Sequence, residues 1–123
     1  MKLFFVLGSV FAFLAVALGA FGAHGLEGKV TERMLQNWKT GVTYQMFHVG
    51  GLFVIAFLIG KLGQTSMLTA AGWLMVAGIL IFSGSLYVMA LTGIKVLGAI
   101  TPIGGLAFLA GWVLVAIAVM KGM

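Results

Sequence analysis

The chain contains two histidines, His24 and His48, and the second of them lies within a cluster of polar residues. Tyr44 and Gln45 precede His48 by four and three residues, so the three side chains share one face of a helix. A second polar group occupies residues 83–87, with the sequence Ser-Gly-Ser-Leu-Tyr. Such side chains can hold a metal ion, line a ligand pocket, or hydrogen-bond to one another.

A metal or catalytic site would have to use both histidines, with Glu27 as a third group. The two imidazoles are far apart in sequence, without the short spacing of a metal-binding helix, and the chain has neither cysteine nor aspartate. It also has no nucleophile–base pair, carboxylate pair or phosphate-binding loop. We therefore expect no metal site, no cofactor and no enzymatic activity.

The elements that carry these residues follow from the distribution of charge. All nine charged side chains fall outside four apolar runs, at residues 3–26, 40–60, 62–94 and 96–120. About 20 apolar residues cross a hydrocarbon core of about 30 Å. With 63% hydrophobic and 7% charged residues, a water-soluble fold is excluded. The sequence predicts one domain, an all-α integral membrane four-helix bundle with spans at about residues 3–23, 41–60, 67–91 and 102–120.

The connections between the spans give further expectations. The first apolar run is longer than the core of a secretory signal, of about 7 to 15 residues, so we expect it to be retained as a helix. Residues 31–39 predict a short interfacial helix before the second span, with Trp38 at headgroup depth. For the fourth span, we expect Thr101 to be the N-cap and Pro102 the first helical residue.

Small residues form a stripe on two of the predicted spans. Such stripes let helix backbones approach closely in lipid, either within one chain or between copies in a homo-oligomer. The cations are almost evenly divided between the two membrane faces, which allows an antiparallel dimer as one form of oligomer. The stripes are Gly8, Ala12, Ala15, Gly19 and Gly22 on the first span, and Gly104, Gly111 and Ala118 on the fourth.

Threading the spans back and forth gathers most polar side chains near one membrane face. Polar groups within a membrane normally turn inward to find partners. The cluster is therefore a hydrogen-bonded plug that fixes helix register, a small pocket for a lipid headgroup or polar ligand, or a metal site. The pocket hypothesis assigns ligand-binding roles to His24, Tyr44, Gln45, His48, Ser85 and Tyr87.

Four ordered motifs carry a family resemblance that covers nearly the whole chain. The chain resembles the family called domain of unknown function 423, whose members are small four-helix bacterial membrane proteins. This resemblance implies a location in the bacterial plasma membrane, and it implies no activity, substrate or catalytic residue. The motifs are GAFGAHGL at residues 19–26, YQMFH at 44–48, FSGSLY at 82–87 and TPIGG at 101–105, followed by Gly111-Trp112.

We therefore expect a membrane protein with a structural or ligand-binding role and with membrane lipids as partners. The scattered basic residues do not form a patch suited to nucleic acid, so we expect no such partner. The alternative is an oligomeric channel or small-solute transporter, which would require a continuous polar path along an oligomer axis.

Overall fold

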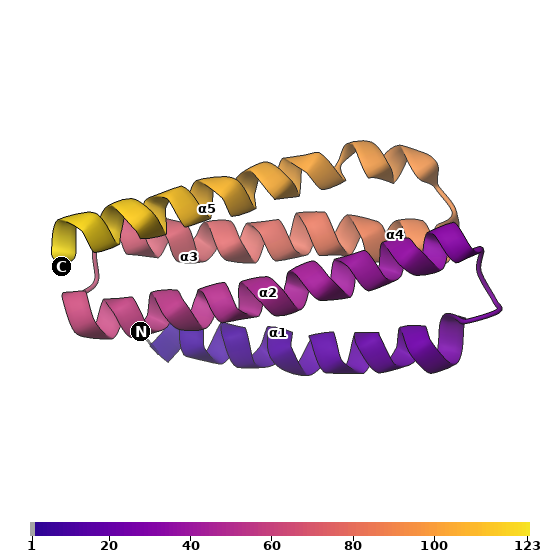
Figure 1. Cartoon of the computed structure of the whole chain (residues 1–123), viewed down its shortest axis with the longest axis horizontal. Helices are drawn as coiled ribbons and strands as arrows, with labels where there is room; N and C mark the ends of the chain where they lie inside the picture. The colour runs from indigo at the N-terminus through magenta and orange to yellow at the C-terminus, as the bar shows by residue number, and fades with distance from the viewer. Residues whose placement is uncertain (1) are drawn as a thin grey trace.

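The structure is a computed structural model that describes residues 2–123, and its elements are all helical. Four helical rods run back and forth, with both termini at one end and the first and third connections at the other (Figure 1). In the part of the chain described, four helices are long and apolar enough to cross a membrane. This confirms the predicted all-α membrane bundle. The elements are α1 Lys2–Phe21, η1 Gly22–Leu26, α2 Glu32–Leu62, α3 Ser66–Gly78, η2 Ile79–Ser83, α4 Gly84–Thr92, η3 Lys95–Ala99 and α5 Thr101–Gly122.

Local sequence signals explain where the helices begin and end. The hydroxyl of Thr31 accepts a hydrogen bond from the backbone N–H of Met34, and Thr65 caps α3 in the same way. These caps satisfy backbone donors that have no partner within the helix. Helices α2 and α4 end at Gly63 and Gly93, which have φ angles of 90° and 74°. Positive φ is accessible to glycine at little cost, so the chain can turn sharply there.

Two expectations about helix starts need correction. Residues 31–39 do not form a separate interfacial helix, because α2 is continuous from Glu32 to Leu62. Trp38 is only 2% exposed and lies beneath α1, where its indole N–H donates to the carbonyl of Leu18. Thr101 does not cap α5. It is the first residue of the helix, and its hydroxyl instead pairs with that of Ser85.

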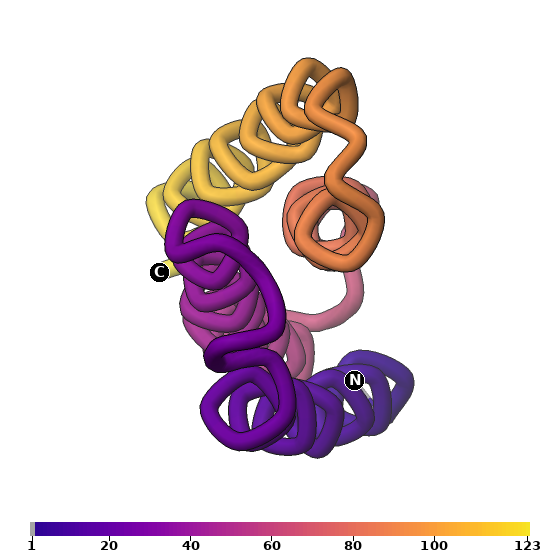
Figure 2. The backbone as a smooth tube through the Cα atoms, turned by 90° about the vertical axis from the view of Figure 1, so that its right-hand side faces the viewer, coloured from indigo at the N-terminus to yellow at the C-terminus, as the bar shows by residue number. Residues whose placement is uncertain are grey.

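Helix α2 lies at the centre of the arrangement, packed against α1 on one side and the α3–η2–α4 rod on another. Helix α5 packs mainly along α3 and η2. Viewed end-on, α2 and α5 slope in opposite directions, so the two helices cross at an angle instead of running side by side (Figure 2). This crossing angle matters for the site, because side chains of α2, η2 and α5 enclose a groove there.

The predicted small-residue stripes are covered by the chain itself. A Cβ at Gly8 would lie 2.8 Å from Phe53, and one at Gly22 would lie 2.5 Å from Trp38, so the first stripe faces α2. A Cβ at Gly104 would lie 2.8 Å from the Cα of Phe82, so the second stripe lets α5 pack directly against η2. The close approach is a packing device within one chain.

The third span is interrupted by η2, a single π-helical segment between α3 and α4. The N–H of Gly84 bonds to the carbonyl of Ile79, five residues back. Such segments often occur at functional sites, because an extra residue in the turn redirects the side chains that follow. Here η2 supplies Phe82 and Ser83, both of which face neighbouring helices.

Candidate functional site

The first part of the polar cluster centres on Gln45, which is 2% exposed. Its side-chain N–H donates to the carbonyl of Phe11 at 2.8 Å, and its Oε1 accepts from the hydroxyl of Tyr87 at 2.7 Å. The amide therefore connects α1, α2 and α4. An amide buried among apolar side chains needs such partners, because leaving them unmade costs about 1 to 3 kcal/mol.

Two further bonds lie beside this amide. The Ser83 hydroxyl donates to the carbonyl of Gly41 at 2.7 Å. The indole ring of Trp38, whose N–H donates to Leu18, lies against the Tyr87 ring with centroids 4.7 Å apart. We call this set, Gln45, Tyr87, Ser83 and Trp38 with their backbone partners, the hydrogen-bonded layer. It sets the register of α1 and α4 against α2.

His48 makes a separate set of contacts on another side of α2, and it is 4% exposed. Its Nδ1 lies 2.7 Å from the carbonyl oxygen of Tyr44, and its Nε2 lies 3.1 Å from the indole nitrogen of Trp112. A carbonyl can only accept and an indole N–H can only donate. His48 is therefore a neutral imidazole with its proton on Nδ1. The ring also stacks on Phe108, with centroids 3.5 Å apart and planes 9° apart.

Ser85 belongs to a third group. Its hydroxyl lies 2.9 Å from the carbonyl of Phe82 and pairs with the hydroxyl of Thr101. This contact ties the start of α5 to the beginning of α4.

The six residues predicted to bind a ligand thus do not line one polar pocket. Gln45 and Tyr87 bond to each other, His48 bonds to Trp112, and Ser85 bonds to Thr101. His24 is exposed in η1 and Tyr44 is 43% exposed, and neither side chain joins the hydrogen-bonded layer.

The buried polar groups of the cluster also all have hydrogen-bond partners. Among residues 2–123, no buried side-chain nitrogen or oxygen lacks a hydrogen-bond partner. In the same range, no group of three His, Cys, Asp or Glu side chains is placed to hold a metal ion. These contacts are those of the hydrogen-bonded plug rather than those of an open polar pocket.

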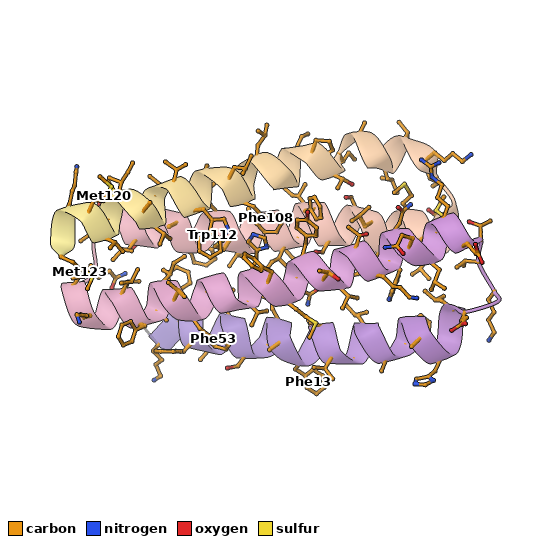
Figure 3. The ribbon with its side chains drawn as sticks, viewed as in Figure 1. Phe13, Phe53, Phe108, Trp112, Met120 and Met123 are labelled. Atoms are coloured by element: carbon orange, nitrogen blue, oxygen red, sulfur yellow. The ribbon has the colours of Figure 1, made fainter. Side chains whose placement is uncertain are left out.

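The principal cavity is an apolar groove of about 770 Å³ between α2 and α5, next to His48. Figure 3 shows Phe108 and Trp112 pointing from α5 into the space between these helices. Of the six predicted residues, only Tyr44 and His48 line the groove. Its lining is Thr43, Tyr44, Phe47, His48, Phe82, Pro102, Gly105, Leu106, Phe108, Leu109 and Trp112.

The sequence contains a signal for the α5 wall of the groove. Pro102, Leu106, Leu109 and Trp112 are spaced by three or four residues and therefore share one helix face. An apolar stripe on a membrane helix is also the pattern of a lipid-facing or core surface. Only the angle between α5 and α2 turns this stripe into the wall of a groove.

The groove extends from the end of the bundle with the first and third connections to about its middle. From Pro102 to Trp112 is ten residues, or about 15 Å at 1.5 Å per residue. This length is about half of a 30 Å hydrocarbon core. The groove therefore has the depth of one leaflet, with its mouth at the end of the first and third connections.

Comparison with known proteins gives a consistent set of relatives. The family model described as Protein of unknown function (DUF423) matches residues 18–105. A UPF0382 membrane protein of Bacillus subtilis (strain 168) is 57% identical over 121 residues, covering 98% of each chain. One from Staphylococcus haemolyticus is 50% identical over 122 residues, again covering 98% of each chain. No solved structure matches the chain at a significant level.

Proposed function

We propose that this chain, which belongs to the family described as Protein of unknown function (DUF423), binds a membrane lipid in the groove between α2 and α5. In this proposal it is a multi-pass protein of the bacterial plasma membrane, as its bacterial relatives named membrane proteins suggest. The groove itself carries the proposal. Its volume of about 770 Å³ lies within the range of about 300 to 1,000 Å³ that is typical of ligand sites.

The chemistry of the lining favours an acyl chain as the part of the lipid that enters. Six of its eleven residues carry aromatic rings, and the deep end is formed by His48, Phe108 and Trp112. Both ring nitrogens of His48 are occupied by protein partners. The deep end therefore offers large apolar surfaces and no free polar group, which suits hydrocarbon rather than a headgroup or hydrated solute.

The polar contacts have a structural role in this proposal, because they hold the walls of the groove. The His48–Trp112 bond connects α2 to α5 at the deep end, and the Ser85–Thr101 pair anchors the first turn of α5. The hydrogen-bonded layer holds α1 and α4 against the other sides of α2. The groove is thus preformed, which lowers the cost of ordering its walls when a lipid binds.

A groove-filling variant provides the test. A Cβ at Gly105 would meet only the Phe82 ring, at 3.8 Å, so Gly105→Phe should place a ring in the groove without displacing backbone. The matched control is Gly50→Phe, because Gly50 is exposed and a Cβ there would meet nothing within 4 Å. Both variants are made in a Trp73→Phe background, since Trp73 is exposed and Trp38 is buried.

The readout is quenching of Trp112 fluorescence by lipids with brominated acyl chains in liposomes. We expect strong quenching in the background protein and in Gly50→Phe, with a clear loss in Gly105→Phe. Native mass spectrometry should give the same order for the number of lipids retained. Equal quenching and equal lipid retention in all three proteins would contradict binding in the groove.

The alternative function is an oligomeric channel or small-solute transporter. The small-residue stripes first suggested an oligomer, but their close contacts here are with α2 and η2 of the same chain. A homo-oligomer would therefore have to use other surfaces. Solute flux into liposomes that depends on the purified protein would favour the channel over lipid binding. The absence of enzymatic activity stays a prediction.

A further inference from the structure

We propose that the bound lipid is an anionic phospholipid, with its phosphate at Lys39 and Thr43 and one acyl chain running past Tyr44 to Trp112. This inference rests on the proposed function and adds the headgroup class and the direction in which the lipid lies. Its basis is the order of charge, hydroxyl groups and rings along one face of α2.

The mouth of the groove is marked by Thr43, which lies on its wall. Lys39 precedes Thr43 by four residues in the same helix, so the two lie on one face, about 6 Å apart along the axis. Side chains in a helix lean toward its N-terminus, which for α2 is the membrane face with the groove mouth. Lys39 is exposed, so its ammonium group is available at the depth of a lipid phosphate.

The polar groups then change with depth in the order found in a phospholipid. Lys39 is cationic, Thr43 and Tyr44 provide hydroxyls one turn deeper, and His48 begins the apolar part formed by rings. A phospholipid presents a phosphate, then ester carbonyls, then hydrocarbon. Tyr44 is 43% exposed and its hydroxyl is outside the hydrogen-bonded layer, and tyrosine rings commonly lie where apolar and polar zones meet.

The surrounding charge favours an anion. At the end of the bundle with the first and third connections are four cations, Lys29, Arg33, Lys39 and Lys95, against two acids, Glu27 and Glu32. The balance of four against two leaves +2. Glu32 shares the face of Lys39 but lies seven residues farther out, about 10 Å along α2. Lys95 begins η3, which leads into the α5 wall of the groove.

The opposite end of α2 supplies a matched control. Lys61 lies beside a shallower apolar groove of about 410 Å³, lined by Phe5, Phe57 and Gly60. That lining has a lysine and aromatic rings but no hydroxyl group. Lys61→Gln and Lys39→Gln therefore remove the same charge at the two ends of one helix, and only the second removes it at the mouth of the α2–α5 groove.

The experiment measures lipid preference in nanodiscs that contain equal amounts of phosphatidylglycerol and phosphatidylcholine. The protein is released with its bound lipid and the two classes are counted by native mass spectrometry. We expect the wild type to prefer phosphatidylglycerol. Lys39→Gln should reduce that preference about fivefold, Lys61→Gln should leave it unchanged, and Gly105→Phe should reduce the retention of both lipids.

The outcomes separate this inference from the proposed function. A wild type without preference, or equal preferences in Lys39→Gln and Lys61→Gln, would overturn the headgroup assignment even if Gly105→Phe still lost both lipids. Retention of both lipids by Gly105→Phe at the wild-type level would overturn binding in the groove itself. Thermal unfolding of Lys39→Gln at the wild-type temperature would show that a lost preference does not reflect misfolding.

Discussion

The indole N–H of Trp112 donates to Nε2 of His48 across 3.1 Å, which joins α5 to α2 at the deep end of the groove. Because the other ring nitrogen faces the Tyr44 carbonyl, this bond fixes the tautomer of His48. A histidine in a membrane helix suggests metal binding or proton transfer. In this chain the ring has no nitrogen free for either, and its flat contact with Phe108 makes it part of the packing.

The tautomer of His48 gives the first prediction. In detergent at pH 7, nitrogen NMR of the wild type should show a protonated Nδ1 and an unprotonated Nε2 on this ring. Trp112→Phe removes the donor to Nε2 and should produce a mixture of tautomers. The exposed His24 serves as an internal reference, because its spectrum should not change with the variant. A wild-type ring protonated on Nε2 would contradict the assigned contacts.

The Tyr87–Gln45 hydrogen bond gives the second prediction. Tyr87→Phe retains the ring against Trp38 but leaves the Gln45 Oε1 without its donor. We expect a loss of about 1 kcal/mol in the free energy of unfolding, measured by titration with a denaturing detergent. The double variant Tyr87→Phe/Gln45→Leu should lose less free energy of unfolding than the sum of the losses in the two single variants.

The control for this pair is Tyr44→Phe, because Tyr44 is 43% exposed and its hydroxyl is outside the hydrogen-bonded layer. Its stability should equal that of the wild type. If the losses in free energy of unfolding from Tyr87→Phe and Gln45→Leu were strictly additive, the two side chains would not interact.

Adjacent glycines at the start of α5 give the third prediction. A Cβ at Gly104 would lie 2.8 Å from the backbone Cα of Phe82, which cannot move aside as a side chain could. Gly104→Ala should therefore destabilise the bundle by about 1 to 3 kcal/mol through overpacking. Gly105→Ala adds an ordinary contact at 3.8 Å and removes a poor helix former, so its stability should be unchanged or higher. Circular dichroism during thermal unfolding compares them, and equal melting temperatures would contradict the close approach of α5 to η2.

The positions of two tryptophans give the fourth prediction. Trp38 is 2% exposed and Trp73 is 47% exposed. Fluorescence of a protein that retains only Trp73 should be quenched strongly by brominated lipids, whereas one that retains only Trp38 should be quenched weakly at every bromine depth. Strong quenching of Trp38 by bromines near the headgroup would instead support the interfacial position that its sequence context suggested.

The fold class could be predicted because a membrane imposes a strong one-dimensional rule. A charged residue in the middle of a span is costly, and the backbone of a span must satisfy its own hydrogen bonds. The apolar runs therefore predict the helical bundle. The sequence predicted the first and last residues of these helices less well than it predicted the helices themselves. The sequence around Trp38 is typical of a membrane interface. Only the packing of Trp38 against Leu18 on another helix shows that its side chain is buried.

The candidate site, too, could be predicted from the sequence only in part. The spacing of Tyr44, Gln45 and His48 predicts that the three side chains share one face of a helix. Their partners Phe11, Tyr87 and Trp112 lie on three other helices, and nothing local in the sequence selects them. Tertiary packing alone divided the polar residues between two sides of α2.

The sequence by itself determined that this protein lies in a membrane, how many times its apolar runs can cross it, and which depth holds its polar side chains. The tertiary structure decided that the buried ones among those side chains all have hydrogen-bond partners and that the open space beside them is apolar. The physical reason is that transfer into lipid depends on the composition of each segment, whereas a groove depends on the angle between α2 and α5. That angle follows from contacts such as Gly104 against Phe82, between residues that are distant in the chain.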